Sequence, residues 1–181
     1  MALLIPPPRV LEGARRARSN MDSFFRDSNG VVCCYADGSC MEPKRNAGVG
    51  VWFGPDNVAN ISEPLPVPGT NNRAELLALL YAIYAAKEAG LQQLIIRSDS
   101  QYAIKCVTDY LPRWKSNSWM TAGGDDVQNQ TEIRAIDGAS VGISVKYEWV
   151  KGHAGHHGNG EADALAKKAA EQSLRNHQAG Y

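Results

Sequence analysis

The chain lacks long apolar runs and lacks an excess of charge of either sign, and each absence excludes a class of protein. No uninterrupted apolar stretch approaches the roughly 20 residues that a membrane-spanning helix needs, so we expect no membrane partner. Lys and Arg together number 19, as do Asp and Glu, so any basic site for nucleic acid must be local. The length of 181 residues indicates one domain plus a tail.

Cysteine is also scarce. The four cysteines have neither the spacing of a zinc site nor a convincing disulfide pattern; they are Cys33, Cys34, Cys40 and Cys106. Two are adjacent within an apolar stretch, where a free thiol behaves as a small hydrophobic group. We therefore expect a reducing intracellular compartment, the nucleus or the cytoplasm.

The first 28 residues differ in composition from the rest of the chain. They are rich in arginine and contain few acids, and the triplet Pro6-Pro7-Pro8 disfavours an amphipathic helix there. We expect residues 1–28 to be a disordered basic arm, residues 29–175 the folded domain and residues 176–181 a C-terminal tail. The alternative for the arm is an organelle transit peptide, which would place the protein in the mitochondrion, with Met21 as a second start codon.

The stretch from Val31 to Ser39 is a short apolar run that stops at Asp37-Gly38, which predicts a strand buried on both faces. Further strands and helices follow from hydrophobic periodicity and turn residues. Strands are expected over residues 47–54, 58–62, 94–98 and 143–150, and helices over 71–89, 100–108, 127–136 and 160–173. Three strands precede the first of these helices, and strands alternate with helices after it. The sequence therefore predicts an α/β fold, a mixed sheet flanked by helices.

Four acids stand at the ends of these elements: Asp37, Glu75, Asp99 and Asp163. Each has a structural explanation by itself. Asp37 suits a turn, Glu75 with Asn72 suits a capping box, Asp99 suits a helix cap, and Asp163 suits a helix N-terminus. Together they would repel one another unless cations neutralised them. Carboxylate oxygens select Mg²⁺, and two such ions about 3.5–4 Å apart can support phosphodiester hydrolysis.

Five segments resemble the ribonuclease H family, in its cellular type-1 branch. They are Tyr35-Ala36-Asp37-Gly38, Thr70 to Leu76, Ser98-Asp99-Ser100, Trp114 to Trp119, and Val150 to Ala166. The segments occur in the family's order and span nearly all of the chain beyond the arm. We expect the N-terminal hybrid-binding domain of many eukaryotic relatives to be absent.

The resemblance implies a ribonuclease H-like fold, a five-stranded mixed sheet in the order 3-2-1-4-5 with the second strand antiparallel. It implies an endoribonuclease, a hydrolase that cuts the RNA strand of RNA/DNA hybrids with two Mg²⁺ ions (Mn²⁺ as a substitute) and leaves 5′-phosphate and 3′-hydroxyl ends. Asp37, Glu75, Asp99 and Asp163 match the metal-binding acids, and His153 matches a mobile-loop histidine that assists proton movement or product release. No obligate protein partner is implied, and we expect a monomer.

The resemblance also assigns substrate contacts. Gly38 and Ser39 would let the backbone approach the RNA strand, and Asn71 and Asn72 would bond 2′-hydroxyls and base edges in the minor groove. The remaining matches concern the DNA strand: Tyr102, Tyr110, Trp114 and Lys115 along a channel, and Thr70 and Asn129 in a phosphate pocket. Pro68 stands where many members have an arginine of that pocket, which predicts a weaker pocket here.

Three other interpretations stay open at this point. The chain could be a binding module for hybrids that has lost catalysis, although all four acids are present. It could be an integrase-like strand-transfer enzyme of the same superfold, which the segment from Lys151 to Asp163 and the Trp-rich loop disfavour. A zinc site at His153, His156 and His157 lacks a nearby cysteine.

Overall fold

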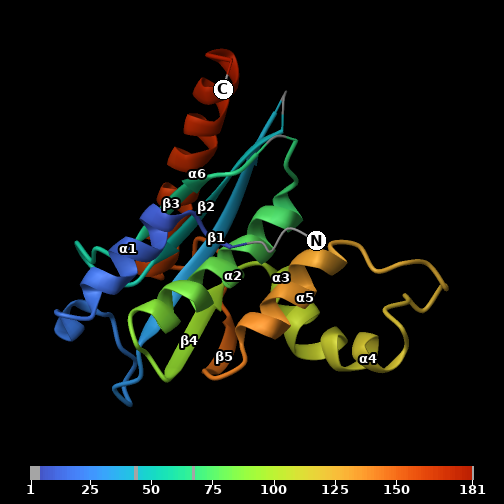
Figure 1. The fold of residues 1–181 in the computed structure, drawn as a ribbon, viewed down its shortest axis with the longest axis horizontal. Helices are drawn as coiled ribbons and strands as arrows, with labels where there is room; N and C mark the ends of the chain where they lie inside the picture. The colour runs from blue at the N-terminus through green and yellow to red at the C-terminus, as the bar shows by residue number, and fades with distance from the viewer. Residues whose placement is uncertain (1–4, 43–44, 67, 181) are drawn as a thin grey trace.

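A computed structural model describes residues 5–42, 45–66 and 68–180 of the chain. Five strands form one mixed sheet in the order β3-β2-β1-β4-β5 (Figure 1). They are β1 (Cys33–Met41), β2 (Asn46–Trp52), β3 (Ile61–Pro64), β4 (Gln93–Ser98) and β5 (Ser144–Trp149). β2 is antiparallel to β1 and to β3, whereas β4 is parallel to β1 and to β5. The predicted α/β class, strand order and antiparallel second strand are confirmed.

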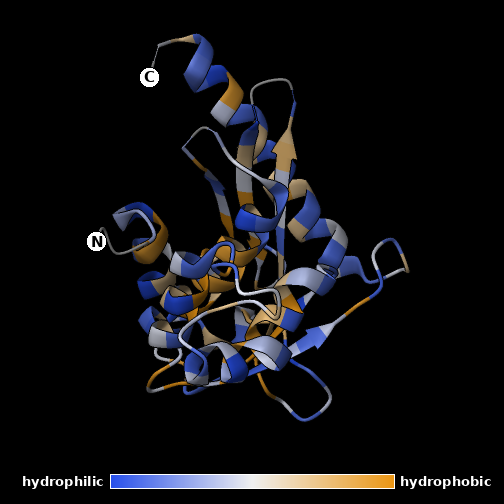
Figure 2. Ribbon diagram, turned by 90° about the vertical axis from the view of Figure 1, so that its right-hand side faces the viewer, coloured by the Kyte–Doolittle hydropathy of each residue, from blue (hydrophilic) through white to orange (hydrophobic). Residues whose placement is uncertain are grey.

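The central strand β1 divides its side chains between two apolar layers, because successive residues of a strand point to opposite faces. Cys34 and Ala36 belong to the larger cluster under α2 (Asn71–Glu88). Tyr35 joins Trp52 in a smaller cluster on the face that α6 (His157–Gln178) covers. Hydrophobic residues accordingly gather between the sheet and its helices, with hydrophilic residues outside (Figure 2).

The close packing of α6 on the sheet depends on residues without bulk. A Cβ atom at Gly48 would lie 2.4 Å from the backbone nitrogen of Ala170, and one at Gly50 would lie 2.1 Å from the carbonyl oxygen of Ala162. No side chain fits at these distances, so the helix backbone rests almost directly on β2. This close approach fixes the position of α6 on the sheet. It therefore also fixes where the first turns of α6 lie beside β1.

Within the described residues 5–28, the N-terminal segment forms two short helices, which differs from the expected disordered arm. The helix α1 (Pro8–Ala17) packs against α2 and buries Leu11, Ala14 and Ala17. Pro8 occupies the first turn of α1, where the missing N–H would have no helical partner in any case. The proline triplet therefore begins a helix instead of excluding one. After α1, the short helix η1 (Met21–Ser23) leads to Phe24, which is also buried.

Two ion pairs tie α1 to the rest of the fold. Arg9 pairs with the buried carboxylate of Glu63 in β3, and Arg15 pairs with Glu88 at the end of α2 at 2.7 Å. Burial raises the pKa of Glu63, and the Arg9 cation opposes that rise. Removing Arg9 would thus leave a buried carboxylate without its counter-ion.

The remaining helices differ from expectation mainly at their ends. The expected helix over residues 100–108 is α3 (Gln101–Lys105) followed by the π-helix η2 (Cys106–Tyr110) and α4 (Leu111–Ser116). The next helix, α5 (Gln130–Ala139), begins three residues later than expected. The last helix, α6, continues to Gln178, into the expected C-terminal tail. Over the described ranges, none of the helices combines the length and apolar character needed to cross a membrane.

Candidate metal centre

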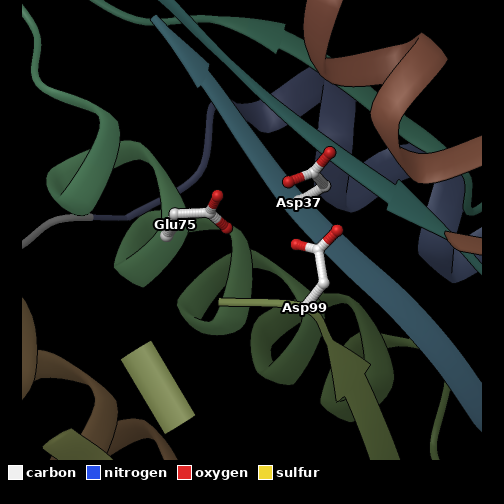
Figure 3. Close-up of side chains that lie close together, drawn as sticks. All are labelled: Asp37, Glu75 and Asp99. Carbon is white, nitrogen blue, oxygen red and sulfur yellow. The ribbon is translucent and has the colours of Figure 1, made fainter. Parts of the chain in front are cut away.

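Three of the four acids converge at one edge of the sheet. Asp37 comes from the middle of β1, Asp99 follows the end of β4, and Glu75 lies in the first turns of α2. Each offers a carboxylate oxygen, and these three atoms lie within 4.8 Å of one another. Figure 3 shows the three carboxylates pointing into a common space. The parallel pairing of β1 with β4 brings Asp37 and Asp99 together, although they are far apart in sequence.

Gly38 brings the third acid into place. A Cβ atom at Gly38 would lie 2.3 Å from the backbone nitrogen of Glu75, so only glycine lets α2 approach β1 this closely. The backbone N–H of Gly38 donates to Asp37 Oδ1 at 2.9 Å and to Glu75 Oε2 at 3.1 Å. The side of Gly38 on which a Cβ atom would lie is therefore occupied by α2.

Burial and the closeness of the carboxylates to one another dominate the electrostatics of the cluster. Asp37 and Glu75 are 6% and 7% exposed. Burial, followed by the charge of Asp99, raises the pKa of Asp37 to about 7. Burial, followed by the charge of Asp37, raises the pKa of Glu75 to about 10. Burial and mutual repulsion make the negative charge of these carboxylates unfavourable, and a bound cation would offset that cost. Oxygen ligands of this kind suit a hard divalent cation such as Mg²⁺.

The structural explanations offered for two of the acids fail. Thr70, not Asn72, is the N-cap of α2, and its side chain accepts from the backbone N–H of Arg73 at 3.1 Å. Ser100, not Asp99, caps α3, with its hydroxyl oxygen accepting from the N–H of Ala103 at 3.1 Å. Neither Glu75 nor Asp99 is therefore needed as a cap.

The fourth acid lies beside the cluster but is already paired. Asp163 lines a cavity of about 510 Å³ together with Asp99 and His153. Lys167, one turn later in α6, donates to Asp163 Oδ2 at 2.7 Å. His153 is exposed, has a positive φ of 56° and lies on the loop before α6. The structure thus brings all five expected catalytic residues to one end of the sheet, with Asp163 outside the tight group of three.

One polar residue of this cavity was not among the expected site residues. Asn159 is 5% exposed and lies in the first turn of α6. Its Nδ2 group donates to Asp99 Oδ2 at 3.0 Å. Its position within the segment from Val150 to Ala166 was visible in the sequence, but the contact with Asp99 depends on how α6 meets β4.

The residues expected to contact substrate fall into two groups. Thr70, Asn71, Asn72 and Asn129 line a second cavity of about 420 Å³ together with Gln128. Asn129, which precedes α5 with a φ of 54°, donates from Nδ2 to the hydroxyl of Tyr102 at 2.9 Å. This bond links Tyr102 to the same cavity.

The second group lies around α4, in the part of the chain that extends away from the sheet in Figure 1. The rings of Tyr110 and Trp114 have centroids 5.4 Å apart, and those of Trp114 and Trp119 are 6.3 Å apart. Arg134 lies over the ring of Trp119 at 4.4 Å. Lys115 pairs with Asp137 at 2.8 Å, so its charge is partly neutralised within the protein. Ser39 lies in β1 just beyond Gly38 and is half-buried.

A mixed sheet in this order, with an acid on its central strand and two more acids beside it, one just after β4 and one in α2, defines a ribonuclease H-like domain. Comparisons with known proteins identify the family within this class. The model of the RNase H family matches residues 29–171. Ribonuclease H of Ralstonia nicotianae is 40% identical over 153 residues, which are 82% of this chain and 97% of the relative. The chain belongs to the RNase H family.

Other relatives share the domain within different lengths of chain. Ribonuclease H1 of Mus musculus is 37% identical over 155 residues, and the match covers 84% of this chain but 54% of the mouse protein. The chain thus spans about half the length of that relative.

Solved structures of relatives show the same domain. The crystal structure of LC9-RNase H1, a type 1 RNase H with the type 2 active-site motif, superposes with a TM-score of 0.63 at 29% identity. That match covers 78% of this chain and 72% of the other. RNase H1 of Halobacterium salinarum NRC-1 has a TM-score of 0.54 at 25% identity, covering 79% of this chain and 99% of that one.

Proposed function

We propose that this protein is an endoribonuclease that hydrolyses the RNA strand of RNA/DNA hybrids and requires a divalent cation. The observation that carries the proposal is the convergence of Asp37, Glu75 and Asp99 within 4.8 Å, in a chain of the RNase H family. Several relatives carry the name ribonuclease H, which supports the same activity here.

The four acids Asp37, Glu75, Asp99 and Asp163 would hold two Mg²⁺ ions, with Mn²⁺ as a substitute. When bound, the ions would supply an activated water and stabilise the leaving oxygen, giving 5′-phosphate and 3′-hydroxyl ends. Lys167 bonds to Oδ2 of Asp163, so Asp163 would offer a cation its Oδ1 atom or exchange the bond to Lys167 for the cation. All four acids come from one chain, so the proposed site needs no residue from a second copy.

His153 would move a proton at the site or assist product release. It shares the cavity of Asp99 and Asp163, and Gly152 and Gly155 flank it on a loop that carries few fixed contacts. Its exposure keeps the imidazole in contact with solvent, which suits a group that exchanges protons.

The two groups of substrate residues support recognition of a hybrid. Asn71 and Asn72 are exposed in the first turn of α2, one turn before Glu75, where their amides would reach the 2′-hydroxyls that distinguish RNA from DNA. The aromatic rings of Tyr110 and Trp114 would pack along the DNA strand, and the cavity of Thr70 and Asn129 would take one of its phosphates. Gly38 would contact the RNA strand only through its backbone.

A cleavage assay with matched duplexes tests the proposal. Labelled RNA/DNA, RNA/RNA and DNA/DNA duplexes are incubated with the protein and either MgCl₂ or EDTA. We expect cleavage of the hybrid's RNA strand in MgCl₂ alone, with fragments whose 5′ ends become ligatable without a kinase. Survival of the hybrid in MgCl₂, or equal cleavage of DNA/DNA, would refute the function. Hybrid retention on a filter without cleavage would point to a binding module.

A further inference from the structure

The side-chain amide of Asn159 is buried, and only one of its two polar atoms has a hydrogen-bond partner among the described residues. Its Nδ2 group donates to Asp99 Oδ2, while its Oδ1 atom is buried and has no donor within hydrogen-bond distance among the described residues. Buried polar atoms without a partner are rare in folded proteins and call for an explanation. The orientation of the amide is fixed by chemistry, since the reverse orientation would set its oxygen against the carboxylate of Asp99.

The role of Asn159 is not explained by the helix in which it lies. The N-cap of α6 is His156, and no side-chain cap bond is made there. The backbone N–H of Asn159 donates to the carbonyl of His156, so the backbone of the first turn is satisfied without the amide. Asparagine is also a poor helix former compared with the alanines that follow it in α6.

The surroundings of Asn159 place its side chain beside the acids. It lines the cavity that Asp99, His153 and Asp163 also line. Two other residues lie against Asp99. Trp149 Nε1 donates to its backbone carbonyl at 3.1 Å, and Gly152, which has no Cβ atom, leaves room for its Oδ2. Of these contacts, only the one from Asn159 fixes the rotation of the carboxylate itself.

We propose that Asn159 is a positioning residue of the metal centre. Its Nδ2 group fixes the carboxylate of Asp99 for the cation, and its Oδ1 atom accepts a hydrogen bond from a water molecule of the hydrated ion. Mg²⁺ retains several of its waters in protein sites, and these waters are donors that match a buried acceptor. The inference rests on the proposed function, because it requires a cation at the acids.

Binding of Mn²⁺ to the metal-free protein, followed by the electron paramagnetic resonance signal of the free ion, tests this inference without any turnover. Asn159→Leu keeps the volume of the side chain and removes both the donor and the unpaired acceptor. Asn159→Ala removes the same groups and leaves a cavity. We expect both variants to bind Mn²⁺ roughly 10-fold to 100-fold more weakly than wild type, as is typical for residues that orient metal ligands.

A second buried asparagine provides the matched control. Asn57 is 4% exposed, donates to Ser23 Oγ at 3.0 Å and accepts from the N–H of Ala59 at 2.8 Å. Asn57→Ala should lower the melting temperature and leave Mn²⁺ affinity within twofold of wild type. The inference is overturned if Asn159→Leu folds and binds Mn²⁺ as wild type does, or if Asn57→Ala weakens binding equally.

Hybrid cleavage measured on the same samples separates the inference from the proposed function. A wild-type protein that binds Mn²⁺ but does not cut the hybrid would refute the function, while the comparison of Asn159 with Asn57 would still decide the role of Asn159. We also expect the Asn159 variants to need more Mg²⁺ for half-maximal cleavage, with KM for the hybrid nearly unchanged.

Discussion

Neutralising Asp37 should stabilise the metal-free protein while abolishing its activity. In Asp37→Asn, the new Oδ1 atom can still accept from the N–H of Gly38, and the new amide can donate to the carboxylates within 4.8 Å of it. The side chain is almost isosteric, so packing is retained. What disappears is a buried negative charge that burial and the charge of Asp99 both disfavour.

The magnitude follows from the pKa of Asp37, which is raised from 3.8 to about 7. Each unit corresponds to about 1.4 kcal/mol, so ionised Asp37 costs the folded state at most about 4 kcal/mol. We expect a gain of about 2 kcal/mol, because the asparagine amide must also be desolvated. In a domain of this size, that gain corresponds to a rise in Tm of about 4–8 °C.

The sign of the pH dependence makes the prediction specific. Because the folded pKa lies above the unfolded one, Asp37 favours the folded state below pH 4 and loses that contribution as the pH rises to about 7. The difference in Tm between the variant and wild type should therefore grow from pH 4 to pH 7 in EDTA. MgCl₂ should reduce the difference by stabilising wild type alone.

Thermal denaturation followed by circular dichroism, in EDTA and in MgCl₂ at several pH values, measures these differences. Asp22→Asn is the control, because that carboxylate is exposed in η1 and its removal should change Tm little at any pH. The reasoning is refuted if Asp37→Asn is no more stable than wild type at pH 8 in EDTA, or if the gain is equal at pH 5 and pH 8.

Three further predictions test the N-terminal helix, the packing of α6 and the histidine loop. Leu11→Ala should destabilise the protein by about 1–3 kcal/mol in urea denaturation, whereas the exposed Arg16→Ala should have little effect; equal stabilities would mean that α1 does not pack. Gly50→Ala should cost about 1–3 kcal/mol or more and reduce cleavage, because α6 must move, whereas Gly138→Ala in the exposed face of α5 should stabilise by about 0.5–1 kcal/mol. A Gly50→Ala protein as stable as wild type would contradict the close approach of helix and strand. His153→Ala should slow multiple-turnover cleavage of the hybrid without abolishing it, and a complete loss in single-turnover assays would show that its role is more than auxiliary.

The sequence by itself determined the elements and the positions of the acids along them. Apolar runs that end in an acid placed Asp99 at a strand end and Asp37 on the central strand, although Asp37 lies in the middle of β1 and not at its end. Helical periodicity placed Glu75 near the start of a helix. These patterns are local, since each depends on residues within a few positions. The order of the sheet and the shared role of the four acids came instead from resemblance to a family, because spacing alone does not show that distant acids meet.

The tertiary structure decided everything that depends on close approach between elements. Gly38 and Gly50 are ordinary turn or strand glycines in the sequence, but each makes room for the backbone of a helix that comes much later in the chain. The hydrogen bond from Asn159 to Asp99 arises in the same way. The proline triplet and the composition of the N-terminal segment did not predict α1. Burial of Leu11, Ala14 and Ala17 against the rest of the fold stabilises this helix, and that packing is visible only in the tertiary structure. Local sequence patterns therefore identified the candidate metal ligands. Contacts between elements distant in sequence determine how close together the carboxylates of those ligands are held.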